Sequence, residues 1–360
     1  MPSVIRLSSS LPSLSSKFST MGFSAWDTDS ESCGYSSGCS DCSLEDEDVN
    51  SRIKPYWPKY RYLFEERGYH LDTVRDARAY YRRVEELSPD VFLHDSISSI
   101  LCSEEGSSND NELCPDAGLP DNLFRGIKAS DGKKFVAKAI HAYSREYEIV
   151  RLLSSQPLCD DPMNHTIPIL DLFECAADQV AFIVMEEWSS QLIPASGGPC
   201  CLTLFLEAVR QWIEHTVFMH RNHIAHLDIS LRNLVTDFQG HYSYIDFELS
   251  RNFDGIQNPR IFGHHATEVP PECDSGSCCD PFQVDVWALG ALIRRICLIL
   301  EHDVPELVQL SASMMNPCPK SRPRAKDVLA GFDEMVARIR PRIPEGCTKK
   351  QDCTKIREPR

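Results

Sequence analysis

The sequence predicts an α+β protein with two lobes, in which a small, strand-rich lobe precedes a larger helical lobe. Between residues 124 and 185, short apolar runs typical of strands alternate with turn residues around one helix-like segment. From residue 204 onward, apolar residues recur at helical spacing, and residues 285–340 keep a helical pattern that is interrupted at prolines. A hydrophobic content of 42% and a charged content of 25% are ordinary for a globular protein.

The part of the chain that precedes these lobes has a different composition. Residues 1–54 are rich in serine and then in acidic residues, and their apolar surface is too small to offset the entropy lost on ordering. We therefore expect this segment to be disordered. Residues 55–119 begin with aromatic residues at helical spacing, such as Trp57, Tyr60 and Phe64, and end in a polar, acidic loop. We predict that they form a helical extension that packs on the strand-rich lobe.

A predicted hairpin opens the strand-rich lobe. The turn between its two strands contains Asp131-Gly132, and glycine accepts the positive φ that such a turn requires. A helix that contains Glu146 comes next, and two further strands are predicted at residues 167–173 and 180–185. After a linker rich in proline and glycine, a predicted helix at residues 204–221 leads directly into the stretch with the most chemical information.

That stretch is formed by residues 226–233 and 245–247. Asp228 is followed five positions later by Asn233, and Asp246 lies thirteen positions beyond Asn233. Phosphoryl transfer needs such a set, because one carboxylate must orient the attacking hydroxyl while an amide oxygen and another carboxylate hold Mg²⁺ against the phosphates. Asp228 is therefore the candidate catalytic base, and Asn233 and Asp246 are the candidate metal ligands.

Together with His226 and Phe247, this pattern resembles the catalytic loop and the metal-binding turn of protein kinases. Three later motifs occur in the order that the family shows. The resemblance implies that Glu272 closes an activation segment and pairs with Arg322, and that Asp285 begins a central helix and holds the backbone of the catalytic loop.

The resemblance covers residues 120–335, with a small lobe at 120–188 and a large lobe at 200–335, and it implies a two-lobed protein kinase-like fold that uses ATP and Mg²⁺. Residues 336–360 follow as a basic C-terminal tail. The aromatic extension at residues 55–119 resembles that of divergent protein kinase-like proteins in fungi.

The same resemblance assigns the nucleotide contacts. Lys138, in the run Phe-Val-Ala-Lys, matches the lysine that pairs the α- and β-phosphates, and Glu146 on the next helix would hold its ammonium. The hinge would follow the strand at 180–185 and would present to the adenine the backbone of Glu186, Glu187 and Trp188. Arg232 stands where tyrosine kinases have an arginine, and it would supply positive charge near the transferred phosphate.

The sequence also departs from the family pattern. No G-x-G-x-x-G motif precedes Lys138, so the backbone amides that cradle phosphates are not identifiable. Leu227 replaces the arginine that normally meets an activation-loop phosphate, and we therefore expect that phosphorylation of Ser250 or Thr267 is not an activating switch. Glu248 replaces the glycine that usually follows Asp-Phe.

These observations favour an ATP- and Mg²⁺-dependent protein serine/threonine kinase whose protein substrate the sequence does not identify. One alternative is a pseudokinase that serves as a nucleotide-binding scaffold, which the missing glycine loop and Leu227 favour. The other is a small-molecule phosphotransferase resembling choline kinase. Glu248 and Ser230 favour this second alternative, and the motifs at Glu272, Asp285 and Arg322 oppose it.

Composition narrows the partners further. A formal net charge of −16 argues against general nucleic-acid binding, which needs a basic surface, and no apolar run is long enough to cross a bilayer. The sixteen cysteines lack paired zinc-knuckle spacing, so we expect reduced thiols and an intracellular location, in the cytoplasm or the nucleus. The serine-rich first 26 residues leave a mitochondrial transit peptide open as the alternative.

Overall fold

The computed structural model describes residues 53–87, 110–116, 118–190, 202–274, 278–300 and 304–340. The segment at 1–54, which we expected to be disordered, lies outside the described residues except for Ile53 and Lys54, and most of the basic tail also lies outside them. Two compact units make up the chain. The first includes residues 72–117, and the second includes residues 44–71 and 118–360.

The described part of the first unit is helix α2 (Val74–Leu87) with the segment 110–116. Asp76 fixes the start of the helix, because its carboxylate accepts hydrogen bonds from the backbone N–H and the hydroxyl of Thr73, at 3.0 and 2.6 Å. Arg78, which is only 3% exposed, donates to Asp110 at 2.8 Å and ties the helix to the returning segment. The helix expected in the extension is therefore present.

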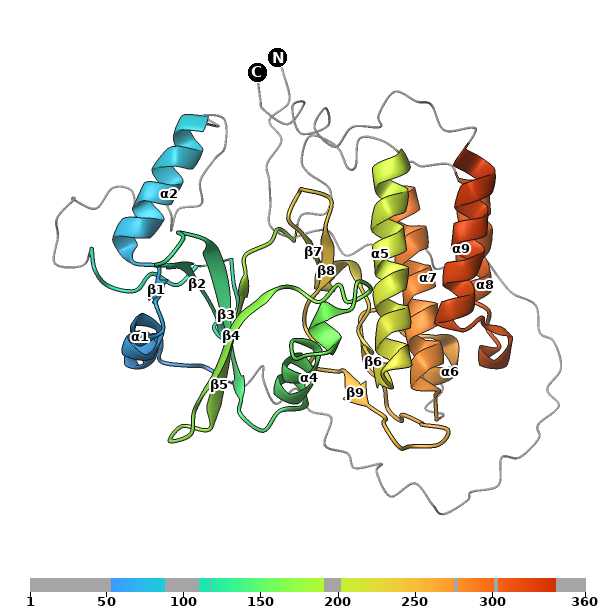
Figure 1. Cartoon of the computed structure of the whole chain (residues 1–360), viewed down its shortest axis with the longest axis horizontal. Helices are drawn as coiled ribbons and strands as arrows, with labels where there is room; N and C mark the ends of the chain where they lie inside the picture. The colour runs from blue at the N-terminus through green and yellow to red at the C-terminus, as the bar shows by residue number, and fades with distance from the viewer. Residues whose placement is uncertain are drawn as a thin grey trace. The chain divides into compact units, whose positions relative to one another are not determined.

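The second unit begins with an antiparallel sheet of five strands in the order β1-β2-β3-β5-β4 (Figure 1). The strands are β1 (Tyr69–Leu71), β2 (Leu123–Lys128), β3 (Lys134–His141), β4 (Ile169–Cys175) and β5 (Val180–Glu186). The expected hairpin joins β2 to β3, and Gly132 in its turn has a φ of +70°. Helix α4 (Arg145–Leu153) follows β3 and begins at Ser144, whose hydroxyl accepts from the backbone N–H of Tyr147.

Helix α1 (Trp57–Glu66) packs on this sheet through aromatic side chains. The ring of Trp57 lies 5.1 Å from that of Phe124 and 5.8 Å from that of Phe182, measured between centroids. Phe64, which is fully buried, meets Phe182 edge to face at 5.1 Å. The aromatic spacing at the start of the extension therefore marks a helix that covers the strand-rich lobe.

Strand β1 is an element that the sequence analysis did not predict. It is three residues long, and only Tyr69 and Leu71 are buried, so its alternating pattern is too short to distinguish from a loop. It pairs with β2 beside Gly126, where an added Cβ would lie 2.3 Å from the carbonyl oxygen of His70 and 2.5 Å from the ring of Phe135. The sheet thus starts within the predicted helical extension, and Gly126 permits the close approach of β1.

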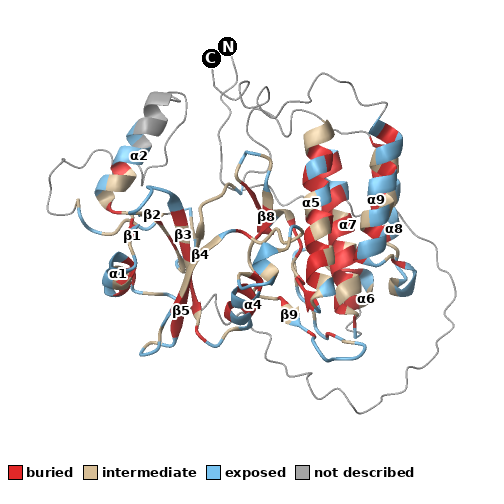
Figure 2. Ribbon diagram, in the orientation of Figure 1, coloured by how far each residue is buried: buried red, intermediate tan, exposed pale blue. Residues whose placement is uncertain are grey.

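The large lobe is mainly helical, and its core lies between long helices whose facing sides are buried (Figure 2). The helices are α5 (Leu202–Arg221), α6 (Pro271–Asp274), α7 (Pro281–Ile299), α8 (Pro305–Met314) and α9 (Ala325–Ile339). Two small sheets flank α5, formed by β6 (Ile224–Ala225) with β9 (Arg251–Asn252) and by β7 (Leu234–Thr236) with β8 (Tyr242–Tyr244). Short 3₁₀ turns complete the second unit, at η2 (Leu158–Asp160), η3 (Leu231–Asn233) and η4 (Pro319–Ser321).

The long helices approach one another closely where small residues allow it. Gly290 of α7 faces α8, and a Cβ at this position would lie 2.9 Å from Cβ of Met314 and 3.1 Å from the carbonyl oxygen of Ser311. The α+β architecture with a strand-rich lobe and a helical lobe is as predicted. Among the described helices, none combines the length and the apolar character that a bilayer span requires.

Candidate active site

The loop that contains Asp228 is held in place by a carboxylate from α7. Asp285 is fully buried and accepts hydrogen bonds from the backbone N–H groups of His226 and Leu227, at 2.8 and 2.7 Å. His220 at the end of α5 contacts the same carboxylate through Nε2 at 3.0 Å. Leu227 has a φ of +65°, which is unfavourable for a leucine, so these charge-assisted bonds hold a strained turn. The sequence analysis expected Asp285 to contact this backbone.

Both carboxylate oxygens of Asp228 accept hydrogen bonds. Oδ2 accepts from Nδ2 of Asn233 at 2.7 Å, and Oδ1 accepts from the backbone N–H of Thr267 at 3.1 Å. Nδ2 of Asn233 also donates to the carbonyl oxygen of Asp228 at 2.9 Å. Because its amide nitrogen is committed to Asp228, the amide oxygen of Asn233 is the atom that can bind a metal.

Lys138 connects the two lobes at this site. Its ammonium donates to Glu146 on α4 at 2.7 Å and to Asp246 in the large lobe at 2.8 Å. Asp246 has a φ of +64°, so the turn that carries it is also unusual for a residue other than glycine. The gap of eight residues between Lys138 and Glu146 does not prevent their contact, because the short α4 begins at Arg145.

The electrostatics of this cluster favour a charged lysine. Burial by itself lowers the pKa of Lys138, but the carboxylates of Glu146 and Asp246 outweigh it and leave the pKa above its ordinary value. Burial raises the pKa of Glu146, while Lys138 acts in the opposite direction. Glu146 is 2% exposed, so Lys138 is the cation that makes its ionised form tolerable at this depth.

The oxygen atoms around Asp246 could hold a hard cation. The carboxylates of Glu146, Asp246 and Glu248 lie within 4.8 Å of one another, and no other such group of potential ligands occurs among the described residues. These carboxylate oxygens suit Mg²⁺, and the predicted ligand Asn233 would add an amide oxygen. The sequence analysis did not identify Glu248 as a possible ligand, because the turn that brings it beside Asp246 is not visible in the sequence.

Buried aromatic and imidazole rings support the site from the large lobe. The ring of His226 lies 5.1 Å from that of Phe247 and 5.4 Å from that of Tyr244, and His215 stacks on Tyr244 at 4.6 Å. Burial lowers the pKa of His226, and it lowers that of His215 strongly. Both imidazoles are therefore neutral near pH 7 and act as packing groups, and the sequence did not identify His215.

The three residues predicted as a hinge differ in their backbone contacts, and their role in adenine binding stays a prediction. The backbone N–H of Glu186 donates to Pro168 and that of Glu187 donates to Lys134, so these two donors serve the sheet. The side chain of Glu187 pairs with Arg125 at 2.7 Å, and the indole of Trp188 donates to Glu186 at 3.0 Å. Of the three predicted residues, Trp188 is the one whose backbone N–H has no hydrogen-bond acceptor within the described chain.

The connections between strands contain no phosphate-binding glycine motif. Residues 72–122 join β1 to β2 and include the first unit, while residues 129–133 form the short turn from β2 to β3. Neither connection contains G-x-G-x-x-G. Arg232 is exposed on η3, next to Asn233. Its contact with a transferred phosphate stays a prediction.

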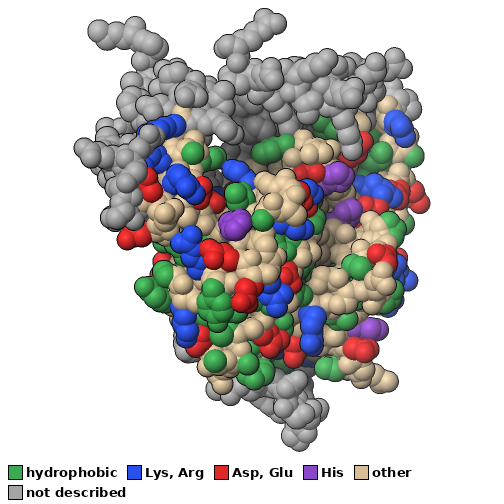
Figure 3. All heavy atoms as spheres, turned by 60° about the vertical axis from the view of Figure 1, so that its left-hand side comes forward, with side chains coloured by type: hydrophobic (Ala, Val, Ile, Leu, Met, Phe, Trp, Pro, Cys, Tyr) green, Lys and Arg blue, Asp and Glu red, His purple; other side chains and the backbone are tan. Residues whose placement is uncertain are grey.

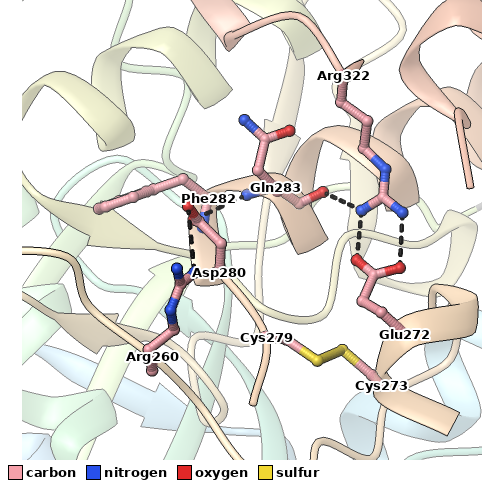
Figure 4. The surroundings of a disulfide bond; sticks show 8 residues. All are labelled: Arg260, Glu272, Cys273, Cys279, Asp280, Phe282, Gln283 and Arg322. Atoms are coloured by element: carbon pink, nitrogen blue, oxygen red, sulfur yellow. Dashed lines mark hydrogen bonds and ion pairs between the residues drawn. A yellow bond between two sulfur atoms is a disulfide. The ribbon is translucent and has the colours of Figure 1, made fainter. Parts of the chain in front are cut away.

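Glu272, which the sequence analysis places at the end of an activation segment, forms an ion pair with Arg322 (Figure 4). The guanidinium of Arg322 donates to both carboxylate oxygens of Glu272, at 2.5 and 2.7 Å, and also to the carbonyl oxygens of Gln283 and Asn316. This bidentate ion pair is the one that the sequence motifs suggested. It joins α6 to the chain that precedes α9.

Ser250 is fully buried, and its hydroxyl donates to the carbonyl oxygen of His226 at 2.9 Å. Its burial does not conflict with the expectation that phosphorylation of Ser250 is not an activating switch, which stays a prediction.

One expectation needs correction. The expectation of reduced thiols differs from the structure, in which a disulfide joins Cys273 and Cys279 (Figure 4). The sequence offered no signal for this pair, because the two cysteines lie outside any recognisable framework spacing.

Comparisons with known proteins point to protein kinases. The chain is 28% identical over 215 residues to crinkler effector protein 8 of Phytophthora infestans, which covers 57% of the chain and 32% of that protein. It is 30% identical over 176 residues to a probable serine/threonine-protein kinase of Enterocytozoon bieneusi, with 46% and 29% covered. A probable serine/threonine-protein kinase of Dictyostelium discoideum is 23% identical over 288 residues, with 63% and 52% covered.

The matched region therefore spans less than two thirds of the length of each of these relatives. No family model matches the chain.

Proposed function

We propose that this chain, a divergent member of the protein kinase-like family, transfers the γ-phosphoryl group of ATP to serine or threonine hydroxyls of a protein, with Mg²⁺ as the metal. Relatives named as serine/threonine kinases support a protein kinase function. The observation that carries the finer proposal is the cluster in which Lys138 from the strand-rich lobe meets Glu146 and Asp246.

Each residue of this cluster, and of the pair Asp228 and Asn233, has a task in the proposal. Lys138 would bind the phosphates of ATP, and Glu146 would keep its ammonium in position. Asp228 would orient the acceptor hydroxyl and take its proton, and its bond to Asn233 fixes the carboxylate for that purpose. Asn233 and Asp246 would hold Mg²⁺, which supplies charge neutralisation at the phosphates.

The proposed partners are ATP and a protein substrate. A general nucleic-acid role finds no support in the charge distribution, since the net charge is −16 and, on the face drawn in Figure 3, basic side chains are interspersed with acidic ones. Arg232 would add positive charge beside the transferred phosphoryl group. The Trp188 backbone would contact the adenine.

Asp228→Asn tests the proposed catalytic base. Asparagine keeps the shape and one acceptor oxygen, so we expect ATP affinity to change little. The rate of transfer to protein should fall by a factor of roughly 10²–10⁴, which is the usual contribution of a general base. Transfer of labelled phosphate from Mg-ATP to casein measures the rate, and thermal shift with Mg-ATP measures binding. Equal residual turnover in wild type and variant would mean that Asp228 does not act in catalysis.

Asp237→Asn is a matched control for this experiment. Asp237 lies on a surface turn beyond β7, and its carboxylate accepts from the backbone N–H groups of Gln239 and His241. Its replacement changes the net charge by the same amount without touching the cluster. We expect the turnover of this control to match that of wild type.

A nucleotide-binding scaffold is the second candidate function. The structure favours it in one respect, because the strand connections near Lys138 contain no glycine motif that would position the phosphates for transfer. A scaffold would show Mg-ATP-dependent thermal stabilisation without transfer to casein. A small-molecule kinase would instead transfer phosphate to small alcohols, and the same assay with choline as acceptor separates it.

A further inference from the structure

Cys279 holds both ends of one segment of the large lobe, residues 261–273. At one end, the backbone N–H of Ile261 donates to the carbonyl oxygen of Cys279 at 2.9 Å, and the N–H of Cys279 donates back at 2.8 Å. At the other end, Cys273 is joined to Cys279 by the disulfide, with their Cα atoms 6.0 Å apart. Cys279 itself precedes Asp280, whose side chain begins α7 (Figure 4). The segment is therefore closed into a loop on a rigid helix.

The middle of this loop contacts Asp228, the proposed catalytic base. Thr267 is exposed, and its backbone N–H donates to Oδ1 of Asp228 at 3.1 Å while Asn233 occupies Oδ2. A carboxylate oxygen can accept more than one hydrogen bond, so an acceptor hydroxyl would share Asp228 with these donors. Because Asn233 is buried and fixed by two bonds to Asp228, the exposed Thr267 is the neighbour whose position limits access to the carboxylate.

We propose that the disulfide between Cys273 and Cys279 is a redox-controlled clamp that keeps residues 261–273 over Asp228. This regulatory role rests on the proposed kinase function. In the oxidised protein the closed loop holds Thr267 against Asp228 and opposes acceptor binding. In the reduced protein the covalent closure of the loop is lost. Non-covalent contacts still hold the loop, among them the ion pairs of Glu272 with Arg322 and of Glu268 with Arg295, but it opens away from the carboxylate more often.

The reaction balances with a thiol as the reductant. One thiol molecule attacks one sulfur of the disulfide and forms a mixed disulfide, and a second thiol resolves it, so that two electrons and two protons yield the thiols of Cys273 and Cys279. Two molecules of glutathione become one glutathione disulfide, and the reverse reaction closes the clamp. Cytosolic disulfides, where they occur, are commonly of this reversible kind.

Reduction should leave the surrounding fold intact. The ion pair between Glu272 and Arg322 holds the chain next to Cys273 whether or not the disulfide is present, and the backbone pairing of Ile261 with Cys279 needs no sulfur. The change is therefore expected in the mobility of the loop and in its contact with Asp228. This separates the proposed clamp from a disulfide that only stabilises the fold.

Hydrogen exchange of the peptide that contains Thr267 tests the clamp without any assay of activity. The full chain is compared after treatment with glutathione disulfide and after treatment with dithiothreitol, and peptide mapping verifies the cross-link. We expect slow exchange at Thr267 in the oxidised protein and exchange at least roughly tenfold faster in the reduced protein, the change that loss of about one net hydrogen bond produces.

Two serine variants complete the exchange experiment. Cys279→Ser should exchange fast under both conditions, because it cannot form the cross-link. Cys278→Ser is the matched control, since Cys278 is an exposed neighbour outside the disulfide, and it should behave as wild type. Equal exchange of oxidised and reduced wild type would overturn the clamp, and so would a cross-link from Cys273 to Cys278. If Cys279→Ser melts well below wild type, its exchange is not compared. The difference in exchange between oxidised and reduced wild type then decides whether the clamp exists.

Steady-state kinetics with casein then measure the consequence. We expect reduction to lower KM for casein by roughly tenfold, because Thr267 then limits access of the acceptor to Asp228 less, while KM for ATP changes little. Redox-insensitive transfer to casein would overturn the clamp and leave the kinase function standing. Absent transfer in both states, with exchange that differs between them, would overturn the kinase function and support the clamp as a conformational device.

Discussion

The ammonium of Lys138 binds carboxylates from both lobes of the proposed site. It contacts Glu146 at 2.7 Å and Asp246 at 2.8 Å, and it keeps the buried carboxylate of Glu146 neutralised. An ion pair of this kind adds little net stability, but the loss of one partner leaves an uncompensated charge. The lysine therefore affects the folded protein before any nucleotide binds.

Lys138→Ala should have two measurable effects. The free protein should lose about 3–5 kcal/mol of unfolding free energy, the usual cost of breaking a buried pair. Mg-ATP should also no longer raise the melting temperature, because no glycine loop replaces the lysine at the phosphates. Urea denaturation and thermal shift with Mg-ATP measure the two effects separately.

The double variant Lys138→Ala with Glu146→Gln separates stability from binding. Glutamine removes the uncompensated charge, so most of the lost stability should return while the response to Mg-ATP stays absent. A full response to Mg-ATP in Lys138→Ala would show that another group binds the phosphates.

Motif spacing identified individual residues of the site better than it identified their contacts. Asp228, Asn233, Asp246, Lys138 and Glu146 were found by offsets along the chain. In the structure Asp228 contacts Asn233, and Lys138 contacts both Glu146 and Asp246. The backbone donor of Thr267 was missed, because a main-chain N–H leaves no mark in the side-chain sequence. The roles of all these residues in phosphoryl transfer stay predictions until turnover is measured.

Helix α7 positions the loop that carries the proposed base. Its buried Asp285 accepts two backbone N–H groups from the loop and contacts His220 of α5. The helix itself begins at Asp280, whose carboxylate accepts from the backbone N–H groups of Phe282 and Gln283. Asp285 thus holds the loop, whereas Asp280 caps the start of the helix.

Asp285→Ala should destabilise the fold and disable the loop together. Two buried N–H groups lose a charged acceptor. At roughly 1.5–3 kcal/mol for each such bond, the unfolding free energy should fall by about 3–6 kcal/mol. The turn at Leu227 then loses what holds its positive φ, and kcat for casein should fall more than KM for ATP rises. Urea denaturation and kinetics with casein test both effects.

Asp280→Ala is the control for α7. It removes the helix cap and should cost about 1 kcal/mol, with kcat retained. If Asp285→Ala loses no more stability than Asp280→Ala and keeps its kcat, the carboxylate does not fix the loop.

The elements that sequence predicted well are those with long periodic patterns. Helices α5 and α7 and the hairpin of β2 and β3 follow from apolar spacing and from Asp131-Gly132. The short strand β1 was not predicted, because three residues cannot establish an alternating pattern. Its partner β2 also lies about fifty residues away in the chain. Its place in the sheet depends on Gly126, whose packing role appears only when the strands meet.

Across the whole molecule, neutral buried histidines make the fold sensitive to acid. His215 is fully buried, and its Nδ1 accepts from the backbone N–H of His165 at 3.0 Å, while His226 is buried at the start of the loop that contains Asp228. For each, Nε2 is buried without a hydrogen-bond partner in the described chain. Burial lowers the pKa of both imidazoles, so protonation in the folded state is unfavourable.

The folded protein should therefore lose stability as pH falls below about 6.5, the ordinary pKa that these histidines regain on unfolding. Between that value and the lower folded pKa, the unfolded chain binds more protons, and stability must rise with pH there. Each histidine contributes up to about 1.4 kcal/mol per pH unit, so the pair should remove roughly 2–3 kcal/mol per unit well below pH 6.5. Urea midpoints from pH 7.5 to 5.0 measure this slope.

Two variants test which histidine causes the pH dependence. His215→Gln keeps an acceptor for His165 and should remove about half of the slope, whereas His70→Gln, at an exposed position of β1, should leave the slope unchanged. A slope that is the same in wild type and His215→Gln would show that His215 is not the acid-sensitive group.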